Sequence, residues 1–305
     1  MAASRPAVLG EHGSTALGIA LMVAAMALFA LTDLAIKLAA GRMASPQVVF
    51  VLGTTGLVVF AGLAWIRGEK LFVPEALHWA VLGRNLSEIV GTASMITALA
   101  TTPLTTVGAI LQATPLAVMA GAALLLGETV GWRRWAAASV GFAGVLVVLQ
   151  PWQAGIAPGA AFAVLAMLGL GGRDLMNRQA PKSLPTLVLA AHGLLGVATL
   201  GLVWSLAGPG RVLPPDPPWA LIVVIMICGT GAYFTITASV RAAPVSVVAP
   251  FRYSRLLFLG ALGIVVLGEP ITGALVAGSL LIIASGLYAL ARERQAALHT
   301  TGSRP

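Results

Sequence analysis

Long apolar segments alternate with short polar breaks along almost the whole chain. Each segment holds about 20 residues, the length at which a helix crosses a hydrocarbon core of roughly 30 Å. The pattern therefore predicts an all-α integral membrane protein with ten transmembrane helices. These are expected at residues 16–38, 47–66, 78–100, 104–126, 132–150, 158–178, 186–206, 219–240, 245–267 and 271–291.

The breaks between the apolar segments have the chemistry of helix ends. Residues 67–70 form a polar turn, and residues 208–218, rich in Pro and Gly, form the longest predicted loop. Proline is accepted in the first turn of a helix. It stands near the start of four predicted helices, at Pro103, Pro185, Pro244 and Pro270. Residues 1–15 and 292–305 are expected to be polar tails.

Composition supports a surface that faces lipid. Hydrophobic residues make up 58% of the chain and charged residues only 9%, whereas a soluble domain carries about 25% charged residues. The net charge of +8 comes in short pairs such as Arg133-Arg134 and not in a continuous basic run, so we expect no nucleic-acid partner. One cysteine and four scattered histidines offer no metal-ligand spacing, so neither a metal nor a cofactor is predicted.

The Lys and Arg residues fall mainly on one side of the predicted helices. If the N-terminus is inside, the outer side holds only Lys37, Arg42 and Arg211. The inner side then holds Arg5, Arg67, Lys70, Arg133, Arg134, Arg178, Lys182, Arg241, Arg292, Arg294 and Arg304. This asymmetry follows the positive-inside rule. It predicts a multi-pass protein of the cell (inner) membrane with both termini in the cytoplasm.

The two halves of the chain repeat one another. An offset of 141 residues carries Pro103 onto Pro244 and Glu128 onto Glu269, and each glutamate ends a Leu-Gly-Glu sequence. The same offset carries Asp33 onto Asp174. Five helices in each half, over residues 16–150 and 158–291, force the halves into opposite orientations, as in many transporters. The alternative is a duplication kept only for packing.

Segments 98–150 and 237–291 resemble the repeated unit of the EamA-like family in the drug/metabolite transporter (DMT) superfamily. The first copy has Ala98, Pro103, Pro115, Leu126-Gly127-Glu128, Gly141 and Gly144, and the second has Pro244, Pro250, Leu267-Gly268-Glu269-Pro270 and Gly278. The resemblance implies ten spans, cytoplasmic termini and a central cavity between the halves. It also implies exchange or proton-linked movement of small metabolites without ATP.

A finer similarity involves residues 249–255, Ala-Pro-Phe-Arg-Tyr-Ser-Arg. This stretch is similar to a subset of these carriers, some of which move vitamins or nucleoside-like metabolites. Pro115 has no proline counterpart, because the offset places Leu256 there, so the cavity need not be symmetric.

Arg252 and Arg255 are the first candidates for substrate binding. A charge in mid-membrane costs about 2.5–3.5 kcal/mol on insertion scales, so it needs a partner or a wet cavity. The spacing i, i+3 places both guanidiniums on one helix face with Tyr253 between them, where they could bind a carboxylate or phosphate. The alternative is that they pair with buried acids or extend to the inner headgroups.

Arg84 and Glu88 are spaced i, i+4 in the third predicted helix. They form either a neutralising pair within that helix or part of the substrate pathway, with Arg84 contacting substrate and Glu88 carrying a proton.

Asp33 and Asp174 are acids related by the repeat, and each precedes a basic residue by one turn, Lys37 or Arg178. Arg173 adjoins Asp174. The acids could exchange partners as two gates open and close. The alternative is ion pairing at helix ends, worth about 0–1 kcal/mol if exposed.

Further polar residues lie within the predicted helices. Gln112, which the offset relates to Tyr253, and Tyr233 are candidates for lining the cavity or for hydrogen bonds between helices. Glu128 and Glu269 are expected to cap the helix that follows each of them. His192 is expected to be a packing or hydrogen-bonding residue.

These observations predict a secondary active transporter that moves a small polar metabolite, anionic or zwitterionic, by alternating access, either proton-linked or by exchange. The alternatives are an amino-acid or aromatic-metabolite exporter of the same superfamily and a structural membrane subunit. No clustered acid, base or metal set points to an enzyme. The expected partners are a small-molecule substrate, the lipid bilayer and, in the proton-linked case, protons, and the chain is expected to be a monomer or homodimer.

Overall fold

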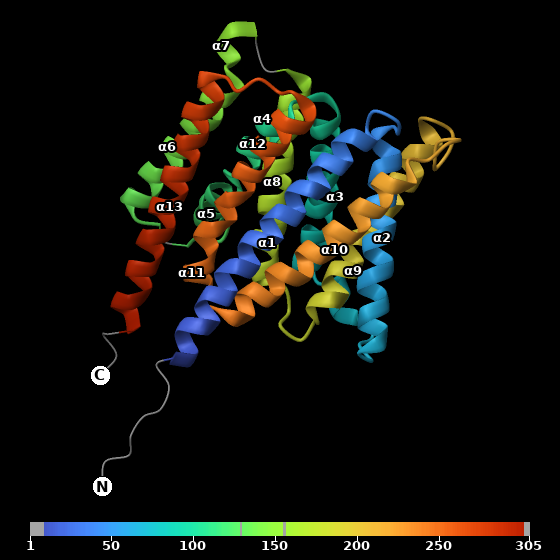
Figure 1. Ribbon diagram of the computed structural model, residues 1–305. Coiled ribbons are helices and arrows are strands. Elements are labelled where there is room, and N and C mark those ends of the chain that lie inside the picture. The colour runs from blue at the N-terminus through green and yellow to red at the C-terminus, as the bar shows by residue number, and fades with distance from the viewer. Residues whose placement is uncertain (1–8, 129, 155–156, 302–305) are drawn as a thin grey trace.

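The computed structural model describes residues 9–128, 130–154 and 157–301, which form helices and no strand (Figure 1). The elements are α1 (Leu9–Ala39), α2 (Ser45–Ile66), η1 (Pro74–Leu77), α3 (Trp79–Thr101), α4 (Leu104–Leu111), α5 (Thr114–Leu125), α6 (Trp132–Leu149), α7 (Pro151–Ala154), α8 (Pro158–Gln179), α9 (Thr186–Ala207), α10 (Trp219–Ala242), α11 (Val245–Val248), η2 (Ala249–Tyr253), α12 (Ser254–Leu267) and α13 (Gly273–Thr301).

The predicted class, an all-α membrane protein, is confirmed. Nine helical stretches of the described chain are long and apolar enough to cross a membrane, with α4 and α5 counted as one stretch and η2 and α12 as another. Helix α3 has 23 residues, but Arg84 and Glu88 interrupt its apolar run. The tenth span therefore stays a prediction that rests on α3.

The helices at both termini are longer than expected. Helix α1 begins at Leu9, inside the predicted tail 1–15, and α13 continues to Thr301, through most of the predicted tail 292–305. The residues that follow Arg292 favour helix and include neither Gly nor Pro before Gly302, so nothing in the sequence stops α13 earlier.

Two predicted helices are broken near a proline. Between α4 and α5, Pro115 has no N–H to donate to the carbonyl of Leu111, and the hydroxyl of Thr114 donates to that carbonyl instead, at 2.6 Å. In the second half, the predicted helix 245–267 is divided into α11, the 3₁₀ turn η2 and α12, with Pro250 in η2.

Packing between the halves follows an approximate two-fold symmetry. The offset of the repeat relates α1 to α8, α2 to α9, α3 to α10 and α6 to α13. The four most extensive helix contacts are α3 with α8, α2 with α9, α1 with α10 and α6 with α13. The symmetry relates α3–α8 to α10–α1 and each of the other two pairs to itself. Each of these contacts joins one half to the other, so the main core lies between the halves.

Small residues allow some of these helices to pack closely. A Cβ atom on Gly144 would lie 2.8 Å from the carbonyl oxygen of Gly278, where α6 crosses α13. A Cβ atom on Gly53 would lie 2.7 Å from the Cα of Ala198, where α2 crosses α9. Glycine at these positions lets the backbones approach each other, as is common in membrane helix bundles.

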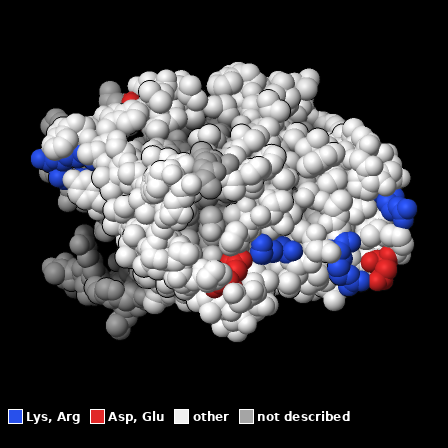
Figure 2. All heavy atoms as spheres, turned by 90° about the horizontal axis from the view of Figure 1, so that it is seen from above, with Lys and Arg blue, Asp and Glu red and all other residues white. Residues whose placement is uncertain are grey.

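Both described chain ends lie on the same side of the bundle. The start of α1 and the end of α13 lie at one end, which we call the terminal end (Figure 1). Figure 2 shows the opposite end, where only a few charged side chains are visible. The exposed pair Arg42–Asp216, at 2.6 Å, belongs to loops of that opposite end.

Candidate functional site

Two arginines and two acids meet where α3 packs against α8. The guanidinium of Arg84 pairs with Glu88 at 2.7 Å, and Arg173 pairs with the other oxygen of Glu88 at 3.2 Å. Arg173 also donates to Asp174 through Nη2 at 2.9 Å and through Nε at 3.0 Å. The predicted pair within α3 is thus present, and α8 extends it into a network that we call the α3–α8 cluster (Arg84, Glu88, Arg173, Asp174).

Arg84 and Glu88 form the buried part of the α3–α8 cluster. The side chains of Arg84 and Glu88 are only 8% and 10% exposed. Arg84 also donates to the carbonyl oxygen of Leu189 at 3.1 Å and to Asn177 Oδ1 at 3.3 Å, so it joins α3 to both α8 and α9. Arg173 and Asp174, at 28% and 32%, form the accessible side of the cluster.

Arg252 lies near this accessible side and forms no ion pair within the described chain. Its side chain comes from η2 and the residue is exposed. Within the described chain its guanidinium has no hydrogen bond or ion pair, and the charges that act on it include those of Asp174, Arg173 and Arg255. Gln112 Nε2 donates to the Arg252 carbonyl at 3.3 Å, which ties η2 to the break between α4 and α5.

Arg255 has a different partner. It donates to one carboxylate oxygen of Asp33 on α1, through Nη2 at 2.5 Å and Nε at 3.1 Å. Its guanidinium also lies 5.3 Å from the ring centre of Phe29. Asp33 is only 4% exposed and needs a cation, so it draws Arg255 towards α1. Of the two predicted receptor arginines, Arg255 is thus paired in this structure, and Arg252 is the one without an ion pair in the described chain.

The two tyrosine candidates lie in different surroundings. Tyr253 is 7% exposed, and its hydroxyl is buried against Gly286 of α13 with no hydrogen-bond partner in the described chain. In this structure Tyr253 is therefore packed against α13, and its role in lining the cavity stays a prediction. Tyr233 on α10 packs edge-on against Phe60, with 4.4 Å between the two ring centres. The charge of Arg84 acts on its hydroxyl, so Tyr233 lies beside the α3–α8 cluster.

The ion pairs expected one helical turn apart do not form. Lys37 donates to the carbonyl oxygens of Leu99 at 3.1 Å and Thr102 at 2.7 Å, and not to Asp33. Carbonyls at the end of α3 have no partner within the helix and so attract the ammonium group. Arg178 pairs with Glu128 at 3.6 Å, and not with Asp174. Helix packing, and not spacing along one helix, selects these partners.

Glu269 does not cap the helix that follows it, α13. Its carboxylate accepts hydrogen bonds from the backbone N–H groups of Leu104 at 2.5 Å and Thr105 at 3.0 Å, and from the Thr105 hydroxyl at 2.8 Å. It thus caps α4, in the other half of the chain. The residue before α4 is Pro103, which makes no side-chain cap of its own. Sequence reasoning missed this contact because it joins the two halves.

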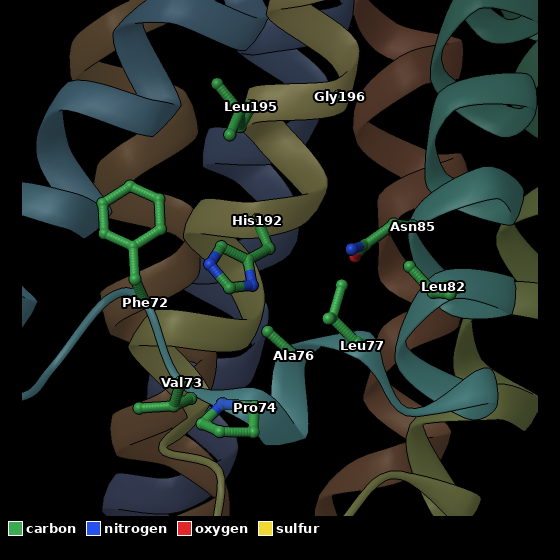
Figure 3. A pocket seen from close by; sticks show the side chains of 10 residues that line it. All are labelled: Phe72, Val73, Pro74, Ala76, Leu77, Leu82, Asn85, His192, Leu195 and Gly196. Carbon is green, nitrogen blue, oxygen red and sulfur yellow. The ribbon is translucent and has the colours of Figure 1, made fainter.

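A hollow of about 560 Å³ lies between η1, α3 and α9 (Figure 3), next to the α3–α8 cluster, since Asn85 of its lining accepts a hydrogen bond from Arg84 Nη1 at 3.1 Å. His192 and Asn85 are the polar residues of its otherwise apolar lining. None of the four charged residues of the α3–α8 cluster lines it, so it lacks the cation that distinguishes the candidate site. Among the described residues, no three His, Cys, Asp or Glu side chains come together as a metal site requires.

Comparison with known proteins agrees with this architecture. The sequence model of the EamA-like transporter family matches the chain twice, over residues 16–150 and 157–290. One solved crystal structure, whose chain is 21% identical, shares the fold with a TM-score of 0.59 and covers 93% of this chain and 98% of its own.

Two named relatives align over most of their length. A riboflavin transporter of Rhizobium johnstonii is 27% identical over 93% of this chain and 94% of its own. An S-adenosylmethionine uptake transporter of Rickettsia prowazekii is 23% identical over 91% of this chain and 94% of its own. The family match covers nearly the whole chain in two copies. The chain therefore belongs to the EamA-like transporter family of the DMT superfamily, as a multi-pass membrane transporter of small metabolites and not an enzyme.

Proposed function

We propose that this chain is a secondary active transporter that takes up a small polar metabolite by alternating access, with Arg252 as its substrate-binding cation. The observation that carries this proposal is that Arg252 is an exposed residue whose guanidinium has no hydrogen-bond or ion-pair partner within the described chain, close enough to the α3–α8 cluster to feel the charge of Asp174. A cation at membrane depth is costly unless water or a ligand compensates it.

The charge balance of the surrounding helices supports this role. Arg84 and Arg173 balance Glu88 and Asp174, and Arg255 balances Asp33. Of the four arginines, Arg252 is thus the one without a paired acid in the described chain. Guanidinium donates two parallel hydrogen bonds to a carboxylate, so an anionic or zwitterionic metabolite fits it.

The named relatives narrow the class of substrate to test first. Riboflavin and S-adenosylmethionine both join a planar nitrogen heterocycle to a hydroxylated carbon chain or ring. Their charges differ, since riboflavin is uncharged and S-adenosylmethionine carries a carboxylate beside two cationic groups. We therefore propose a heterocyclic metabolite that presents either a carboxylate or a ring carbonyl oxygen to Arg252. Tyr233 and Gln112 would contact the rest of the molecule.

We propose that the remaining charged candidates couple substrate movement to a proton or to a counter-substrate. Asp174 and Arg173 are 32% and 28% exposed and adjoin Arg252, so a bound substrate would change their surroundings directly. Glu88 pairs with both Arg84 and Arg173. It would therefore hold these two arginines together unless protonation of its carboxylate released one of them. Asp33 would hold Arg255 on α1. Coupling to protons or to a counter-substrate are the two modes to distinguish.

The proposed topology follows the charge asymmetry and the repeat. With the terminal end in the cytoplasm of the cell (inner) membrane, its Lys and Arg residues obey the positive-inside rule. We propose α3 as the tenth span, because nine crossings would place the start of α1 and the end of α13 at opposite ends, whereas they lie together (Figure 1). The repeats would then be residues 16–150 and 158–291.

Uptake into proteoliposomes tests the function. The panel would contain radiolabelled riboflavin, S-adenosylmethionine and a small dicarboxylate, each with and without an imposed pH gradient. Saturable uptake of one class is expected, and Arg252→Ala should abolish it. The matched control is Arg42→Ala, which removes an exposed arginine of a loop at the opposite end. Unchanged uptake by Arg252→Ala would remove Arg252 from the site, and efflux in place of uptake would reverse the proposed direction.

A further inference from the structure

The loops that carry Glu128 and Glu269 have the same backbone structure. Gly127 and Gly268 both adopt the left-handed conformation, with φ of 68° and 65°. The N–H of Glu128 donates to the Ala122 carbonyl at 3.1 Å, and the N–H of Glu269 donates to the Gly263 carbonyl at 2.9 Å. The repeat offset relates each position to its counterpart. The chain therefore presents two equivalent carboxylates, one at each end of the bundle.

The side chains of these two glutamates are nevertheless in different states. Glu269 makes three hydrogen bonds to the start of α4. The Glu128 side chain is 47% exposed and forms an ion pair with Arg178 at 3.6 Å. The symmetry of the backbone is thus broken at the carboxylates.

Glu269 closes the end of the bundle opposite the terminal end. Its hydrogen bonds tie the loop between α12 and α13 to the junction of α3 and α4. Lys37 of α1 binds carbonyls of the same junction, and the negative charge of Glu269 acts on it. A Cβ atom on Gly263 would lie 2.9 Å from the Glu269 carboxylate and 2.7 Å from the Thr105 methyl, so only glycine permits this approach. Three elements of both halves meet at this carboxylate.

We propose that Glu269 is a latch of the transport cycle. In the state seen here, Glu269 caps α4 and holds the end opposite the termini shut. In the alternate state, Glu269 leaves α4, and this end of the bundle opens. This inference rests on the alternating access proposed above.

Distances between spin labels test the latch in protein without substrate. In a Cys228→Ala background, labels at Thr101→Cys and Ile271→Cys would span the end that Glu269 closes. Labels at Val130→Cys and Ala242→Cys, their counterparts by the offset, would span the terminal end. Glu269→Gln should raise the ratio of open to closed conformers at the first pair about tenfold, as expected from losing one charged hydrogen bond. Glu128→Gln, the matched control, should not open the first pair.

A second variant keeps the test independent of folding defects. Thr105→Val preserves shape and removes only the hydroxyl that donates to Glu269, so it should shift the same distances in the same direction by a smaller factor. Unchanged distances at the first pair in both Glu269→Gln and Thr105→Val would overturn the latch, as would equal opening by Glu128→Gln. A lack of uptake in proteoliposomes would count against the proposed function and leave these distances unaffected, so the two failures are distinguishable.

Discussion

The buried pair of Asp33 and Arg255 should have unequal partners, and their single variants should reveal this. Asp33 is 4% exposed and Arg255 is 21% exposed. Removing one partner of a buried ion pair costs about 3–5 kcal/mol, because the other charge is left without compensation. Arg255→Ala leaves Asp33 almost without access to water, so it should cost that full amount. Asp33→Ala leaves Arg255 partly hydrated and still over the Phe29 ring, so about 2–3 kcal/mol is expected.

The double variant distinguishes pairing from packing. If the cost comes mainly from the orphaned charge, Asp33→Ala with Arg255→Ala should cost less than the sum of the single variants by about 2 kcal/mol. Each free energy of unfolding would be measured by reversible SDS titration of the protein in mixed micelles, followed by circular dichroism. The matched control is Asp216→Ala, which breaks a pair of similar length, 2.6 Å, whose acid is 87% exposed. This control should cost less than about 1 kcal/mol.

Two results would refute this reasoning. The first is additivity of the two single variants within about 0.5 kcal/mol, which would mean that the side chains contribute independently. The second is a larger cost for Asp33→Ala than for Arg255→Ala, since the order of the costs follows directly from the exposed fractions.

Three further predictions concern the α3–α8 cluster, helix packing and Arg252. Glu88→Ala should lower the free energy of unfolding by about 3–5 kcal/mol in the same titration, because it leaves Arg84 and Arg173 without their shared acid. A loss no larger than that of Glu75→Ala, which removes an exposed acid on η1, would contradict this. Gly53→Ala should cost about 1–3 kcal/mol through overpacking against Ala198. Gly62→Ala on the same helix, with no atom within 4 Å of its added Cβ, should not destabilise the protein, and equal losses would argue against tight packing of α2 on α9. Arg252→Lys should leave the unfolding free energy unchanged, since Arg252 has no hydrogen-bond or ion-pair partner within the described chain. It should raise the KM for uptake, because an ammonium group lacks the planar, two-pronged donor arrangement of guanidinium. An unchanged KM would argue against direct contact between Arg252 and the substrate.

Local features of the sequence determined the helices and the pair within α3. The predicted helix 186–206 is observed as Thr186–Ala207, and the predicted helix 158–178 as Pro158–Gln179. Burying a helix in lipid depends on a continuous apolar run, which is readable from the residues alone. The pair of Arg84 with Glu88 depends only on i, i+4 spacing and was also predictable. The match of the family model to two segments agrees with the repeat found from the offset of 141 residues.

The tertiary structure alone decided which charges meet. Asp33 binds Arg255, 222 residues further along the chain, and Glu269 caps α4 across 165 residues. Spacing along one helix had suggested Lys37 for Asp33 and the start of α13 for Glu269. A buried carboxylate takes the cation or helix start that packing brings nearest, and the interface between the halves sets that distance. Hydropathy describes each helix separately, so it contains no information on which faces of the two halves meet.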